Sequence, residues 1–118
     1  MKLPIFKENH WLPKVLSKGS PIEIGAITLG PVIFSRGTMS DVTRNHECIH
    51  WEQYKECLIL GFLLIYVGHW VVNLFRFKFN GKDAYYNICF EVEAYDNDDD
   101  LAYLEKRKRF AWIRHLRN

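Results

Sequence analysis

The chain has 118 residues, a formal net charge of +2 at pH 7, 48% hydrophobic residues and 25% charged residues. This length suffices for one hydrophobic core and leaves no room for a separate substrate domain, so we expect a single domain over residues 1–118. A net charge so close to zero does not indicate a nucleic-acid-binding domain, and we expect no nucleic-acid partner.

The first 39 residues differ from the rest because prolines and glycines interrupt short apolar runs. Two of these runs, residues 22–29 and 32–34, have the length of β-strands, so we expect two or three short strands joined by turns. An edge strand of such a sheet could bind an extended peptide through its main chain. The alternative is a hairpin that only covers the helices.

The sequence His-Glu-Cys-Ile-His at positions 46–50 carries the clearest functional signal. Residues four apart on a helix lie one turn above each other, so His46 and His50 can bind a common metal ion. Glu47 can then reach a water molecule held on that metal and accept its proton. The motif therefore predicts a catalytic zinc site with Glu47 as general base.

The residues around this motif predict that it lies near the start of a helix. Ser40 and Asp41 are good N-cap residues, and residues 42–60 contain no glycine or proline. The alternative is a surface helix that carries two solvated histidines.

A third metal ligand is expected from a second helix, over residues 84–95. Its apolar stripe consists of Ile88, Val92 and Tyr95. Glu91 lies on this stripe, where a carboxylate is costly unless it is paired or bound to a metal. Glu93 lies about 200° away at roughly 100° per residue, so the two carboxylates cannot serve one metal from one face. We therefore select Glu91 as the ligand and keep Glu93 as the alternative.

Two segments together resemble a known family. Residues 46–53 read H-E-C-I-H-W-E-Q and residues 91–95 read E-V-E-A-Y. This pair is similar to the gluzincins, and more closely to small zincin domains that carry H-E-x-x-H-x-x-Q followed by E-x-x-A-D. The resemblance implies a zinc metallopeptidase with one zinc ion per chain, held by His46, His50 and Glu91.

The chain departs from this family pattern at one position. Tyr95 stands where the family has an aspartate, which usually orients a ligand histidine. Asp96, one position further along, is the alternative source of that carboxylate.

Residues 57–75 contain no Asp, Glu, Lys or Arg, which approaches the length of a membrane-spanning helix. Gly61, Gly68, His69 and Asn73 interrupt this run. We expect the first helix to break near residues 61–62 and a second apolar helix to follow over residues 63–75. The run forms either the core of a small domain or a surface that contacts a membrane.

The C-terminal residues 106–117 mix six cations with bulky apolar side chains. Such a segment could lie on an anionic membrane or bind nucleic-acid phosphates. The interpretation we favour is a terminal helix that docks Phe110, Trp112 and Ile113 on the core while its charges are solvated.

Three cysteines without C-x-x-C spacing and the absence of a secretory signal pattern indicate a reduced setting. We therefore expect a cytoplasmic protein, with the inner surface of the membrane as the alternative location.

Taken together, the patterns predict a compact α+β, zincin-like domain with a small N-terminal β element packed on three to four helices. The expected activity is zinc-dependent hydrolysis of peptide or amide bonds, and the expected partner is a peptide or protein substrate. Candidates for steadying the oxyanion are Tyr85, Tyr86, Tyr95 and His69. The alternative function is a non-catalytic zinc-binding domain that associates with a membrane surface or a protein partner.

Overall fold

A small mixed sheet and a set of helices make up the computed structural model, which describes residues 4–18, 20 and 24–116. The sheet order is β1-β3-β2, with β1 parallel and β2 antiparallel to β3. The elements in chain order are β1 (Ile5–Lys7), α1 (Leu12–Ser17), β2 (Ala26–Leu29), β3 (Val32–Ser35), α2 (Asp41–Glu56), α3 (Leu60–Arg76), α4 (Gly81–Tyr86), α5 (Cys89–Asn97), α6 (Tyr103–Lys106) and the 3-10 helix η1 (Ala111–His115).

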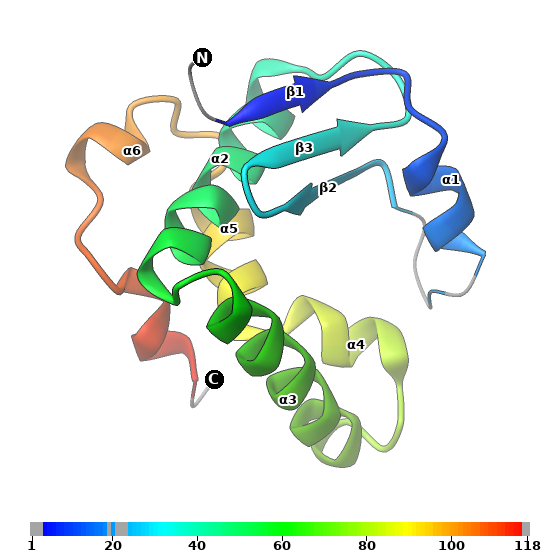
Figure 1. The fold of residues 1–118 in the computed structure, drawn as a ribbon. Coiled ribbons are helices and arrows are strands. Elements are labelled where there is room, and N and C mark those ends of the chain that lie inside the picture. Colours follow the sequence, from blue (N-terminus) through cyan, green and yellow to red (C-terminus); the bar gives the residue numbers. More distant parts are fainter. Residues whose placement is uncertain (1–3, 19, 21–23, 117–118) are drawn as a thin grey trace.

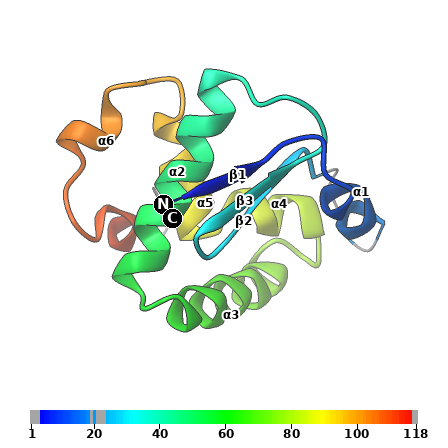
Figure 2. The same ribbon diagram turned by 45° about the horizontal axis from the view of Figure 1, so that its top comes forward.

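This arrangement confirms the expected α+β class. In Figures 1 and 2, β2 is the strand of the sheet that lies nearest to α3, and α5 lies beside α2. The apolar run at residues 32–34 lies within β3, and the described part of the run at 22–29 contains β2, whereas residues 22 and 23 lie outside the described residues. The described residues form six α-helices rather than three or four, because short helices occupy regions that were expected to be continuous or irregular.

Helix α2 begins where the sequence predicts it. The Ser40 side chain accepts a hydrogen bond from the Thr43 amide, as an N-cap residue does. The helix ends at Glu56, earlier than the predicted break at residues 61–62. Leu58 and Ile59 have φ values of 57° and 63°, so the chain turns there through left-handed backbone, and Gly61 lies inside α3.

The second predicted helix, residues 84–95, is divided in the structure, and that expectation was wrong. Helix α4 ends at Tyr86 and α5 begins at Cys89. The Cys89 amide lies at the N-terminus of α5, where an amide has no acceptor within the helix. It donates a hydrogen bond of 2.9 Å to His69 Nδ1 of α3. A side chain from another helix therefore stabilises this break, and no local pattern could reveal it.

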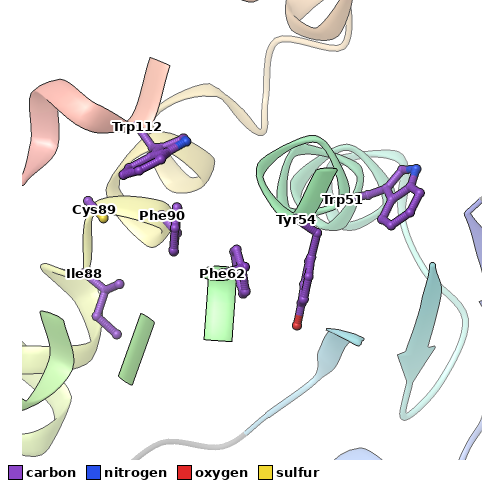
Figure 3. Close-up of a cluster of buried hydrophobic side chains, with 7 residues drawn as sticks. All are labelled: Trp51, Tyr54, Phe62, Ile88, Cys89, Phe90 and Trp112. Carbon is purple, nitrogen blue, oxygen red and sulfur yellow. The ribbon is translucent and has the colours of Figure 1, made fainter. Parts of the chain in front are cut away.

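Aromatic side chains from α2, α3, α5 and η1 form the main core (Figure 3). The Phe62 ring of α3 stacks between Tyr54 of α2, at 3.8 Å between centroids, and Phe90 of α5, at 4.3 Å. Such contacts add to the burial of apolar area and fix the relative placement of the rings. The stack therefore holds together the helices that carry the H-E-x-x-H pattern and Glu91.

The long apolar helix α3 is only partly used by this core. Phe62, His69 and Asn73 are buried, while most of the outward side chains are exposed. Of the described helices, none alone is long and apolar enough to cross a bilayer; α2 and α3 together meet that criterion by length and composition, with a bend of 110° between them.

The C-terminal segment differs in part from the expected docked helix. Trp112 of η1 is buried, but Phe110 and Ile113 are 44% and 49% exposed. A second buried anchor is the side chain of Arg107, which forms ion pairs with Glu56 of α2 and Glu93 of α5.

Candidate metal centre

His46, His50 and Glu91 lie together in the interior, as the helical spacing predicted. His46 Nε2 lies 3.2 Å and His50 Nε2 lies 3.0 Å from the same Glu91 oxygen, Oε1. All three side chains are buried, and their ligand atoms lie within 4.8 Å of one another. Two imidazoles and a carboxylate in this geometry could hold a metal ion.

The far nitrogen of His50 is held by an amide. His50 Nδ1 lies 2.7 Å from Gln53 Oε1, while Gln53 Nε2 donates to the Phe90 carbonyl and to Glu93 Oε1. Because the amide oxygen can only accept, Nδ1 of His50 must carry the proton. In the neutral ring Nε2 is then the lone-pair nitrogen, which is the state that a metal ligand needs.

His46 has a carboxylate partner that the sequence did not reveal. His46 Nδ1 lies 3.1 Å from Asp98 Oδ2. Asp98 follows the end of α5, and Asn45 holds this segment by donating to the backbone oxygens of Asn97 and Asp98. Tyr95, which stands where the family pattern has an aspartate, packs its ring against His46 at 4.5 Å between centroids. The acidic run at residues 96–100 was the available signal, but its register could not be read from the pattern.

Glu47 lies beside this group and is also buried. Its Oε1 lies 3.1 Å from the Thr28 hydroxyl of β2, and its Oε2 lies 3.8 Å from His46 Nε2. Burial raises the pKa of Glu47, although the neighbouring histidines lower it in part. One oxygen of the Glu47 carboxylate thus lies next to the potential metal ligands, and Thr28 of β2 holds the other oxygen in place.

Glu91 and the histidines shift one another's pKa values. Burial lowers the pKa of His50, but the charge of Glu91 and its hydrogen bond outweigh this and raise it to about 9. Burial raises the pKa of Glu91, and the two histidines overcome that effect and hold it far below its usual range. In the metal-free group, protonated His50 therefore helps to compensate the buried carboxylate.

Tyrosine side chains line the cleft beside His46, His50 and Glu91. The Tyr66 hydroxyl of α3 donates a hydrogen bond of 2.6 Å to Glu91 Oε2, a contact the sequence did not predict. Tyr85 and Tyr95 lie with their hydroxyls 3.1 Å apart. Of the proposed oxyanion donors, His69 is engaged at the α5 N-terminus, so only Tyr85, Tyr86 and Tyr95 border the site.

A cleft of about 780 Å³ opens beside these residues. Its walls are β2 and the loop after β3 on one side and α3 with α4 on the other. The side chains of His46, Glu47, His50 and Glu91 all line it. The candidate metal centre is therefore reachable by a molecule that enters along β2.

No protein-family model, curated protein or solved structure matches this chain significantly.

Proposed function

We propose that this protein is a zinc-dependent peptidase of the gluzincin type. The observation that carries the proposal is the shared approach of His46 Nε2 and His50 Nε2 to Glu91 Oε1, with Glu47 next to them. Zinc bound by imidazole and carboxylate at about 2.0–2.2 Å in a tetrahedron separates its ligand atoms by roughly 3.3 Å. The observed separations of 3.2 and 3.0 Å fit that ion well.

The number of protein ligands favours a catalytic over a structural ion. Within the described part of the chain, the group contains three ligating side chains. Structural zinc sites have four protein ligands, whereas catalytic sites have three and keep one position for water or substrate. The cleft at this position gives that fourth ligand a path of entry.

Each side chain then has a defined task. A bound zinc ion would supply Lewis acidity and lower the pKa of a coordinated water to about 7. Glu47 accepts the proton of the attacking water and passes it to the leaving amine, while Thr28 keeps its carboxylate in position. Tyr66 holds the outer oxygen of Glu91. Tyr85 and Tyr95 are placed to donate to a substrate oxygen in the cleft.

The edge strand supports a peptide as the substrate. Strand β2 is last in the sheet order and pairs with β3 on one side. Its residues Ala26–Leu29 line the cleft, and the Thr28 carbonyl accepts a hydrogen bond from the Tyr54 hydroxyl. An extended peptide can pair with the other backbone groups of this edge and pass the metal centre.

Replacement of Glu47 by Gln tests this function. Glu47→Gln preserves size and removes the proton acceptor, so zinc content should persist while hydrolysis of a fluorogenic peptide panel falls by roughly 10²–10⁴. Glu52→Gln, on the outer side of the same helix, is the matched control and should retain activity. Equal turnover by wild type and Glu47→Gln contradicts the proposal. A zinc-loaded wild type that cleaves no peptide would favour the non-catalytic zinc domain instead.

A further inference from the structure

Helix α3 presents an apolar face to solvent, which we call the α3 face. It consists of Leu60, Leu63, Leu64, Val67, Val71, Val72 and Phe75, each between 41% and 70% exposed. No charged residue occurs anywhere in residues 57–75. Contiguous exposed apolar surface of this kind on a small domain marks an interaction site.

The core does not explain this composition. The inner side of α3 already supplies Phe62, His69 and Asn73 to the interior. A helix that only covers a core carries polar residues on its outer side, whereas the outer side of α3 is apolar. The α3 face therefore needs a partner outside the core.

The turns at both ends of α3 extend this face. Leu58 and Ile59 before the helix, and Lys78 and Phe79 after it, have φ values between 54° and 63°. Left-handed backbone is costly for such residues, above all for β-branched Ile59. Despite this cost, the turns leave Leu58 at 86% and Phe79 at 66% exposure, so strained backbone displays apolar side chains at each end of the face.

Cations gather at the C-terminal end of α3. Arg76, Lys78 and Lys82 are exposed there and alternate with Phe75 and Phe79. Asp83 is the only acidic residue in residues 75–83. Aromatic rings interleaved with cations suit the boundary between acyl chains and anionic headgroups.

A second group of cations lies near the N-terminal end of α3. Glu56, four residues before that helix, accepts hydrogen bonds from the Phe110 amide and the Trp112 indole. This anchors η1 beside the α2–α3 turn, as Figure 1 also shows. Among the described residues 108–116, the exposed cations are Lys108, Arg109 and Arg114. The apolar face is thus flanked by positive charge at both ends.

We infer that the α3 face docks on an anionic lipid bilayer. Apolar side chains enter the acyl boundary while both groups of cations meet acidic headgroups. A second copy of the chain fits this surface less well, because a paired α3 would bring like-charged ends toward each other. Leu63 and Val67 belong to both the α3 face and the cleft, so docking places the cleft mouth beside the membrane.

Vesicle flotation tests the inference without any activity readout, so its failure would leave the peptidase proposal untouched. The purified full chain should float with phosphatidylcholine–phosphatidylglycerol vesicles, float much less with phosphatidylcholine alone, and be released as salt shortens the Debye length. Absence from both vesicle types, or equal binding to both, would overturn it.

Paired variants locate the contact. Leu64→Gln/Phe75→Gln should weaken binding roughly 100-fold or more, since each buried apolar side chain contributes roughly tenfold or more. The control Val15→Gln/Leu101→Gln changes two equally exposed apolar residues elsewhere and should bind as wild type. Unchanged binding by the α3 variant would place the contact on another surface.

A second pair of variants tests the contribution of the cations. Lys78→Gln/Lys82→Gln should reduce binding by about 25-fold, from roughly fivefold per cation, while Lys7→Gln/Lys14→Gln should alter it far less. Light scattering tests the remaining alternative, in which the α3 face binds a second copy of the chain. A concentration-dependent dimer that Leu64→Gln/Phe75→Gln dissociates would assign the α3 face to a second copy and reject the bilayer.

Discussion

Glu91 and Glu93 lie two residues apart on α5, and both are buried, but their surroundings differ. Glu91 faces His46 and His50 across the cleft. Glu93, which is 0% exposed, faces the opposite way and receives hydrogen bonds from Arg107. One carboxylate is thus neutralised by groups that can lose their protons, and the other by a guanidinium that cannot.

This difference separates a site that can exchange its cation from one that cannot. A metal ion can replace the protons of the histidines and neutralise Glu91 in their place. Arg107 is fixed by two ion pairs, to Glu93 and to Glu56, and ties the C-terminal segment to α2 and α5. Glu91 is therefore suited to function and Glu93 to stability. Four measurements test this difference.

The largest expected effect is on stability. Arg107→Leu leaves Glu56 and Glu93 without their buried cation and should lower the free energy of unfolding by about 3–5 kcal/mol in urea titrations. Arg109→Leu, an exposed neighbour, should change it by no more than about 0.5 kcal/mol. Similar stability of the two variants would show that Glu93 has no structural role.

Replacement of the two carboxylates should affect metal affinity to very different extents. Glu91→Gln removes a ligand and should weaken zinc binding more than about 100-fold, since even outer partners contribute 10–100-fold. Glu93→Gln keeps an oxygen for Gln53 and should remain within about tenfold of wild type. A competition titration with a chromophoric chelator measures both, and the reverse order would move the ligand to Glu93.

A smaller effect should identify the carboxylate that orients His46. Asp98→Ala removes the partner of His46 Nδ1 and should weaken zinc binding by about 10–100-fold. Asp96→Ala, an exposed residue of the same acidic run, is the matched control and should bind like wild type. Loss with Asp96→Ala alone would assign this role to Asp96, the alternative that the sequence offered.

The smallest expected effect concerns pH and the metal-free protein. Because the pKa of His50 is raised from 6.5 to about 9, its contribution to stability is complete below pH 6.5 and is lost as the pH rises through 9. The unfolding free energy of the metal-free protein, measured in chelator, should therefore fall across this interval. His50→Gln should flatten the profile, and an unchanged slope in that variant would assign the effect to other groups.

Sequence reasoning succeeded where local periodicity determines geometry. Helical spacing was sufficient to place His46 above His50 and to choose Glu91 over Glu93 as their neighbour. It failed where distant segments decide the outcome. Asp98 reaches His46 across 52 positions, and Arg107 reaches Glu56 across 51. The break before α5 depends on His69 of another helix. The left-handed turn at Leu58 and Ile59 contains no glycine, so the sequence did not indicate it.

The metal content of the purified protein tests the central claim most directly. Inductively coupled plasma mass spectrometry of wild type should find about one zinc ion per chain, and His46→Ala, His50→Ala and Glu91→Gln should each lose it, because no variant keeps all three ligands. Glu93→Gln should retain the wild-type content. Full zinc occupancy in the histidine variants, or none in the wild type after zinc loading, would contradict the account.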